Sequence, residues 1–247
     1  MSHKVLYAVV FILMSFAIPD KKKIKIWLAG DSTMSVKSEK AYPETGWGMP
    51  FVHFFDSTVT VENLAKNGRS TKTFITEKLW QRITDNLQEG DYVFIQFGHN
   101  DEVKEKVGSY TTPNEFTANL TRFVTETRSK KGNPVLLTPV SRRKFDSTGK
   151  AMETHEQYSA LVRSLSKELN VPLIDLDKKS MALYEQMGVE NSKLLFLQLE
   201  PGEHPNYPKG KVDNTHFNEL GARKIAQIVL AEIKALKLEL ADRIVKR

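Results

Sequence analysis

A short apolar run near the start of the chain, Ile26-Trp27-Leu28-Ala29, ends abruptly at Gly30-Asp31-Ser32-Thr33. Such a run predicts a buried strand, and the polar residues after it place the Ser32 hydroxyl where the chain leaves a sheet. Near the end of the chain, Asp213 and His216 stand three residues apart, so the carboxylate can hold one ring nitrogen while the other faces a serine. Each motif alone occurs often by chance, but the combination predicts a serine hydrolase with Ser32 as nucleophile, His216 as base and Asp213 as its partner.

Short apolar runs alternate with longer amphipathic segments along the chain. The predicted strands are residues 24–29, 59–63, 92–97, 135–138 and 173–176. Apolar residues at helical spacing predict helices over residues 72–87, 114–130, 154–170, 178–187 and 218–237. Strands joined by helical crossovers run parallel, so we expect an α/β fold, a three-layer α/β/α sandwich around a five-stranded parallel sheet.

Polar segments follow the first three predicted strands, namely Gly30-Asp31-Ser32, Asn67-Gly68-Arg69-Ser70 and Gly98-His99-Asn100-Asp101. Ligands of parallel α/β sheets bind beyond the carboxyl ends of the strands, and these ends share one rim of the sheet. We therefore expect the three segments to lie together. The turn from Asp213 to His216, just before the last predicted helix, must return to the same rim to complete a site.

The composition excludes several kinds of site. A chain of 247 residues with 40% apolar and 27% charged residues is ordinary for a globular protein, and we expect residues 24–240 to form a single domain. The absence of cysteine excludes disulfides, a cysteine nucleophile and cysteine-based metal sites. His53, His155 and His204 show no metal-ligand spacing, so we expect no metal and no cofactor.

The formal net charge of +6 favours encounter with polyanions. Uronic-acid polysaccharides, nucleic acids and anionic lipids would all be attracted. A solvated lysine-rich surface without any such partner gives the same charge, so charge alone does not identify a substrate.

Residues 1–17 differ from the rest of the chain. Lys4 is followed by an apolar run over residues 6–14 and then by the small residues Ser15 and Ala17, a pattern typical of a cleaved secretory signal peptide. The alternative is an uncleaved membrane anchor, although the run is shorter than the roughly 20 residues that a span needs. We therefore expect a secreted or periplasmic protein that contacts a membrane only if this segment is retained.

The chain resembles the SGNH (GDSL) hydrolase superfamily, because four sequence blocks of that superfamily occur in order. The blocks are Gly30-Asp31-Ser32, Gly68, Gly98-His99-Asn100-Asp101 and Asp213-Asn214-Thr215-His216. The resemblance implies a flavodoxin-like fold and a serine esterase mechanism without metal, with the triad named above. It also implies an oxyanion hole made by the backbone N–H groups of Ser32 and Gly68 and the side-chain amide of Asn100. The G-x-S-x-G motif of α/β-hydrolases is absent.

Longer stretches resemble the rhamnogalacturonan acetylesterase branch of this superfamily. They are Gly30 to Met34 with Gly46-Trp47-Gly48, Thr138 to Arg143, His155-x-x-Tyr158 and Pro205 to Pro208, within a resemblance that runs from about Lys25 to Ala226. The implied activity is removal of acetyl groups from rhamnogalacturonan in pectin. We expect a monomer that binds an acetylated polysaccharide or oligosaccharide and no nucleic acid.

The sequence leaves two alternatives open. An esterase of the same fold could act on acetyl-xylan, another acetylated glycan or a lipid ester. A catalytically silent glycan-binding protein could retain the fold, but it would not need the intact set Ser32, Asn100, Asp213 and His216.

Four residues are candidate substrate contacts, and each has a structural alternative. His99 could contact substrate or orient its loop through a hydrogen bond. Arg142 and Arg143 could pair with a galacturonate carboxylate, or serve in loop solvation or an internal salt bridge. Trp47 could stack on a sugar ring or pack near the sheet. Asp31 is expected to fix its turn by accepting backbone N–H bonds rather than to carry protons.

Overall fold

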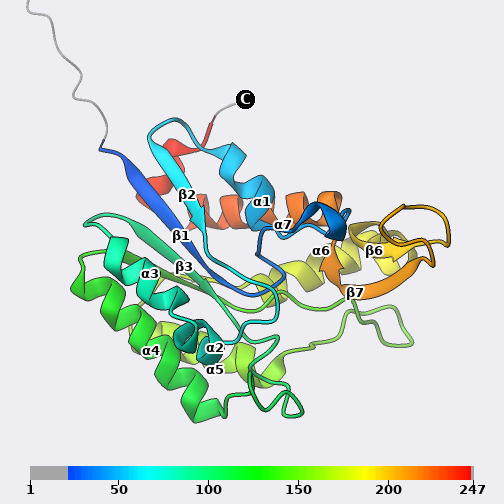
Figure 1. Cartoon of the computed structure of the whole chain (residues 1–247), viewed down its shortest axis with the longest axis horizontal. Helices are drawn as coiled ribbons and strands as arrows, with labels where there is room; N and C mark the ends of the chain where they lie inside the picture. The colour runs from blue at the N-terminus through cyan, green and yellow to red at the C-terminus, as the bar shows by residue number, and fades with distance from the viewer. Residues whose placement is uncertain (1–21, 246–247) are drawn as a thin grey trace, which may run out of the picture.

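The computed structural model describes residues 22–245, which form a three-layer α/β/α sandwich (Figure 1). The parallel strands are arranged in the flavodoxin-like order β2-β1-β3-β4-β5. Their bounds are β1 Ile24–Gly30, β2 Val59–Asn63, β3 Tyr92–Gln96, β4 Asn133–Leu137 and β5 Leu173–Ile174. The predicted fold class and five-stranded parallel sheet are confirmed. The expected signal peptide, residues 1–17, lies outside the described residues.

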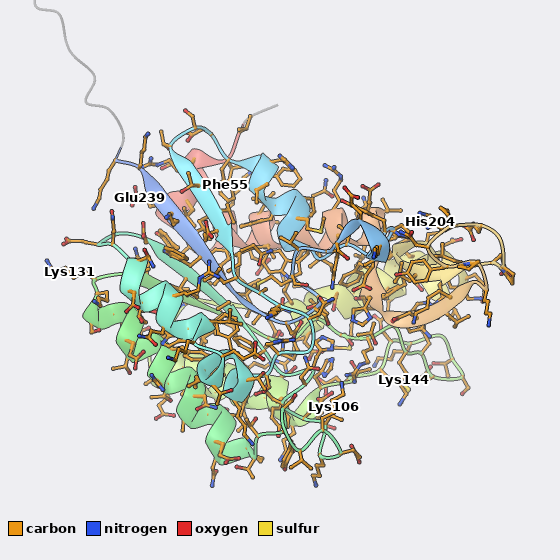
Figure 2. The ribbon with its side chains drawn as sticks, viewed as in Figure 1. Phe55, Lys106, Lys131, Lys144, His204 and Glu239 are labelled. Atoms are coloured by element: carbon orange, nitrogen blue, oxygen red, sulfur yellow. The ribbon has the colours of Figure 1, made fainter. Side chains whose placement is uncertain are left out.

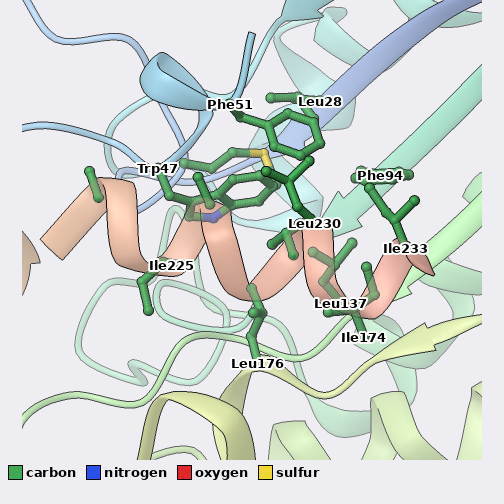
Figure 3. Packing of buried hydrophobic residues seen from close by; sticks show 14 of the residues in the cluster. Leu28, Trp47, Phe51, Phe94, Leu137, Ile174, Leu176, Ile225, Leu230 and Ile233 are labelled. Carbon is green, nitrogen blue, oxygen red and sulfur yellow. The ribbon is translucent and has the colours of Figure 1, made fainter. Parts of the chain in front are cut away.

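The side chains of β1 alternate between two apolar cores, because successive strand residues point to opposite faces of the sheet. Ile26 and Leu28 belong to the core that α7 (Glu219–Ala235) covers, as Figure 3 shows for Leu28. Trp27 and Ala29 belong to the core on the other face. Burial on both faces explains why this strand is a continuous apolar run in the sequence.

Helices cover both faces of the sheet. The face of Trp27 is covered by α2 Thr71–Thr76, α3 Leu79–Asn86, α4 Pro113–Ser129 and α5 Glu156–Glu168. The opposite face is covered by α1 Gly48–Phe51, α6 Leu176–Asn191 and α7. The chain also contains the short 3-10 helices η1 Glu39–Ala41, η2 Val52–Phe54, η3 Ser192–Leu195 and η4 Glu239–Arg243.

The predicted element boundaries are correct in part. The helix predicted over residues 114–130 is α4, which begins one residue earlier because Thr112 caps it in a capping box with Glu115. The predicted helix over residues 72–87 is instead two helices, because Lys78 adopts a left-handed φ of 60° between them. The predicted strand over residues 173–176 stops at Ile174, because Asp175 caps α6.

An antiparallel hairpin beside the sheet was not predicted. Its strands are β6 Phe196–Leu199 and β7 Lys211–Phe217, at the right of Figure 1. The pairing jumps from Leu197↔Asp213 to Phe196↔Phe217, so residues 214–216 bulge out of the ladder. The segment expected as a simple turn therefore belongs to a bulged strand, and pairing with β6 determines its position. Among residues 22–245, no helix is both long and apolar enough to cross a bilayer.

Candidate active site

A serine, a histidine and an aspartate form a continuous hydrogen-bonded chain at the carboxyl end of β1. Ser32 lies in the turn after β1, and its Oγ is 3.0 Å from Nε2 of His216. Nδ1 of His216 is 2.9 Å from Oδ2 of Asp213. Nδ1 therefore donates to the carboxylate, which leaves Nε2 as the acceptor that faces the hydroxyl. Ser32 is partly exposed, so a ligand can reach it.

The carboxylate of Asp213 is held by its own strand bulge. Its Oδ1 accepts hydrogen bonds from the backbone N–H groups of Thr215 (2.7 Å) and His216 (3.0 Å). Burial by itself would raise the pKa of Asp213. The hydrogen bonds from His216 and Thr215 and the electrostatic interaction with the His216 ring outweigh burial and hold that pKa well below its usual range. The carboxylate thus stays ionised and fixes the imidazole in one orientation.

Arg143 supports the bulge that carries the triad histidine. Its backbone N–H donates to the carbonyl of Asn214 (2.8 Å), and its Nη1 donates to Asn214 Oδ1 (3.2 Å). The rest of its guanidinium donates to Ser192 Oγ and to the carbonyl of Val189. These hydrogen bonds give Arg143 a structural role at the bulge; they go to neutral groups and form neither the internal salt bridge nor the carboxylate contact considered for this residue.

The turn that carries Ser32 is fixed by a buried polar chain. Oδ1 of Asp31 accepts from the backbone N–H and the hydroxyl of Thr33, as expected for a residue that fixes its turn. The Thr33 hydroxyl accepts from Nε2 of Gln96 (2.6 Å). Oε1 of Gln96 accepts from Nε1 of Trp47 (2.8 Å). Trp47 is 0% exposed, so the prediction that it stacks on a sugar is wrong. Its indole packs edge-on against Phe51 (Figure 3).

The loops after β2 and β3 bring Gly68 and Asn100 to the same rim. Gly68 has a φ of +76°, in the left-handed region that favours glycine. Asn100 is buried, and its Nδ2 donates to the carbonyl of Arg69 (3.0 Å), which ties the two loops together. Because a primary amide carries two N–H donors, this bond leaves one for a ligand. On the other side of the amide, Lys106 Nζ lies 3.4 Å from Asn100 Oδ1.

Asp101 connects the loop after β3 to neighbouring segments, a role that the sequence analysis missed. Its Oδ1 accepts from the backbone N–H (2.9 Å) and hydroxyl (2.6 Å) of Thr71 and from the hydroxyl of Thr111 (3.0 Å). Burial raises the pKa of Asp101 to about 7, although these bonds oppose the rise. The side chain joins the loop after β3 to the first residue of α2.

His99 and Arg142 belong to one cluster of side chains, together with His155 and Glu102. The ring of His99 lies 4.2 Å from that of His155, measured between centroids, and both rings are buried. Neither ring nitrogen of His99 has a hydrogen-bond partner within residues 22–245, so the loop-orienting alternative is not supported, and the substrate contact stays a prediction. Glu102 accepts from Arg142 Nη1 (3.1 Å) and lies 2.9 Å from Nδ1 of His155. Arg142 therefore makes the internal salt bridge that was its structural alternative.

Lys37 is a second residue that the sequence analysis missed. Its side chain is 0% exposed, although it lies five residues after Ser32 in a polar turn. Burial lowers the pKa of Lys37, while the neighbouring Glu44 opposes that change. In so basic a chain, no local pattern distinguishes this lysine from those on the surface.

No three His, Cys, Asp or Glu side chains gather as a metal site would require within the described part of the chain. The site thus consists of a hydroxyl, an imidazole, a carboxylate and nearby N–H donors. These groups, placed at the rim of a flavodoxin-like sheet, define the class of serine hydrolases.

Comparison with known proteins gives the family. Residues 28–224 match the GDSL-like Lipase/Acylhydrolase family, and the chain belongs to this family of ester hydrolases. It is 44% identical to rhamnogalacturonan acetylesterase RhgT of Bacillus subtilis over 227 residues, which cover 92% of this chain and 97% of the relative. It is also 26% identical to a rhamnogalacturonan acetylesterase of Emericella nidulans, with 91% of each chain covered.

Solved structures agree with the fold. Protein YxiM of Bacillus subtilis superposes with a TM-score of 0.77 at 25% identity, over 89% of this chain and 58% of that longer one. An acetyl-xylooligosaccharide esterase, Axe2 of Geobacillus stearothermophilus, superposes with a TM-score of 0.61 at 19% identity, over 86% of this chain and 94% of that one.

Proposed function

We propose that this protein is a secreted serine esterase that removes acetyl groups from rhamnogalacturonan. The unbroken chain of hydrogen bonds from Ser32 through His216 to Asp213 is the observation that carries the mechanism. The substrate rests on the 44% identity to RhgT, which extends over almost the whole of both chains. Export rests on the signal-like pattern of residues 1–17.

In the proposed reaction, Ser32 Oγ attacks the carbonyl carbon of the acetyl ester while His216 Nε2 takes the hydroxyl proton. The negative charge on the former carbonyl oxygen is stabilised by the N–H groups of Ser32, Gly68 and Asn100. Collapse of this intermediate breaks the ester bond, and His216 returns the proton to the departing sugar hydroxyl.

The acetyl-enzyme is then hydrolysed. Water attacks the acetyl carbonyl, and His216 takes one of its protons. The second intermediate breaks down to acetic acid, which loses its proton to water as acetate, and to free Ser32, whose oxygen regains the proton from His216. Asp213 stays ionised throughout and stabilises the imidazolium formed at each step. No metal is needed, and the protein acts as a monomer without nucleic acid.

Acetate release from acetylated rhamnogalacturonan, acetyl-xylan and a long-chain ester tests the substrate. We expect rhamnogalacturonan to be deacetylated fastest. Faster release from acetyl-xylan would reject the proposed substrate while leaving the serine mechanism intact. No release from any ester would favour the glycan-binding alternative.

A further inference from the structure

A lysine ammonium is buried beside the proposed nucleophile. Lys37 Nζ lies 2.6 Å from the backbone carbonyl oxygen of Ser32, 2.6 Å from Oδ1 of Asn67 and 2.6 Å from Oε1 of Glu44. These three oxygens match the three N–H donors of an ammonium group. A buried charge is costly unless it is paired and hydrogen-bonded, and an apolar side chain would fill the same space without that cost. The position therefore requires the N–H donors of the lysine and not only a side chain of that volume.

The ammonium joins two loops that come from neighbouring strands. Ser32 lies in the turn after β1, and Asn67 lies in the loop after β2. Asn67 Oδ1 also accepts from the hydroxyl of Ser35 (2.6 Å), which adds a second link between the same loops. The Lys37 side chain that makes these links is itself 0% exposed.

The peptide group between Asn67 and Gly68 is held from two sides. Its carbonyl oxygen accepts from Nη1 of Arg69 (2.7 Å), and the side chain of Asn67 is held by Lys37. The N–H of this peptide belongs to Gly68. Fixing the carbonyl and the side chain therefore fixes the direction of that N–H.

We propose that Lys37 is a positioning residue that sets the geometry of the oxyanion hole. It holds the Ser32 turn and the Asn67–Gly68 peptide at a fixed separation, so that two main-chain N–H groups converge on one oxygen. This proposal rests on the roles proposed above for Ser32 and Gly68. Lys37 acts through these groups and contacts none of the reacting atoms.

Loss of this link should affect the transition state more than the ground state. The N–H donors stabilise the oxyanion, which exists only after the hydroxyl has attacked, whereas a ground-state ester interacts with them weakly. Misplaced donors should therefore lower kcat and leave KM nearly unchanged.

The test uses the full-length enzyme and p-nitrophenyl acetate. Lys37→Met keeps the aliphatic stem and removes the donors. We expect kcat to fall about 10–100-fold, less than the 10²–10³-fold typical when a donor is deleted, with KM within about threefold of wild type. The double variant Lys37→Met/Glu44→Gln also removes the carboxylate that would otherwise be left unpaired, and it should show the same loss.

Asn67→Ala provides a test that keeps Lys37 and its ion pair with Glu44, while it removes one of the three acceptors of the ammonium. Asn67 is an exposed residue in a loop, so its variant is expected to fold. We expect a similar loss of kcat. Lys37→Met/Asn67→Ala should be no slower than the slower single variant, because both substitutions break one link.

Two controls separate positioning from general stability. Arg163→Met breaks another partly buried ion pair, with Asp175 and Asp177, and should lower the melting temperature without lowering kcat. Lys131→Met breaks an exposed pair with Glu89, at the opposite side of the molecule from the hairpin that His204 marks in Figure 2, and should change neither quantity.

The outcomes distinguish this proposal from the proposed function. If Ser32→Ala is inactive but Asn67→Ala and every Lys37 variant that folds keep kcat within threefold of wild type, Lys37 is not a positioning residue. If no Lys37 variant folds, the proposal is tested by Asn67→Ala alone, and a kcat within threefold of wild type in that variant rejects it. An active Ser32→Ala enzyme would instead overturn the serine mechanism.

Discussion

Nε2 of His216 lies 3.0 Å from Oγ of Ser32, although 184 residues separate them in the sequence. Ser32 is placed by the parallel sheet, at the end of β1. His216 is placed by the bulge of β7, whose pairing with β6 and bonds to Arg143 set its position. The reactive contact therefore depends on how the hairpin is anchored beside the sheet.

Replacement of the proposed nucleophile should abolish turnover and leave the fold intact. Ser32→Ala removes the only proposed acyl acceptor, so we expect kcat for p-nitrophenyl acetate to fall by about 10⁴-fold or more. The partly exposed hydroxyl contributes little to packing, so the melting temperature should stay near that of wild type. Substantial residual activity in a folded variant would rule out Ser32 as the nucleophile.

Removal of the Asn100 amide should lower kcat selectively. Its free N–H is proposed to strengthen its bond as the carbonyl becomes an oxyanion, so Asn100→Ala should lose about 10²–10³-fold in kcat with little change in KM. Asn119→Ala is a matched control, because Asn119 also uses its Nδ2 in one bond near the start of α2, to Thr71 Oγ1 (3.0 Å). That variant should keep wild-type kcat. Equal kcat values in the two variants would contradict the assignment of Asn100.

Replacement of Arg143 should impair all substrates alike. Arg143→Met removes the side-chain bonds to Asn214 and Ser192 and loosens the bulge that carries His216, so we expect kcat/KM to fall about tenfold. The factor should be the same for rhamnogalacturonan and p-nitrophenyl acetate. Lys144→Met changes the exposed neighbour that Figure 2 labels and should have no effect. A larger loss on the uronate polymer than on the small ester would restore a carboxylate-binding role.

Burial of neutral His99 should make the protein less stable in acid. Burial, with the nearby charge of His155, holds the pKa of His99 well below 6.5. Below pH 6.5 the unfolded chain binds a proton at this residue that the folded protein does not bind, so the free energy of unfolding falls as the pH falls. Between pH 7 and pH 5 this residue should therefore contribute a loss of stability.

Urea unfolding of wild type and His99→Gln at pH 7 and pH 5 measures this contribution. The variant should lose correspondingly less stability over the interval. His53→Gln, which changes an exposed histidine, should keep the wild-type dependence. If His99→Gln kept the pH dependence of wild type, the His99 ring would not be the cause of the loss of stability in acid.

Local patterns in the sequence predicted the five-stranded parallel sheet and the three side chains of the hydrogen-bonded chain Ser32–His216–Asp213. The apolar run of β1 is continuous because both faces of that strand are buried, and Thr112 and Glu115 cap α4 through neighbouring backbone groups. Both signals depend on residues close together in the chain. Strand direction then followed from the helical crossovers, which placed the loops that carry Ser32 and Asn100 on one rim.

Only the tertiary structure decided how the remaining side chains are used. Trp47 and Arg143 carry groups that could bind sugar, yet one is buried under the Ser32 turn and the other is bonded to the β7 bulge. Lys37 is one lysine among many until the loops after β1 and β2 enclose its ammonium. Burial and hydrogen-bond partners come from segments far apart in the sequence, and no local pattern encodes them.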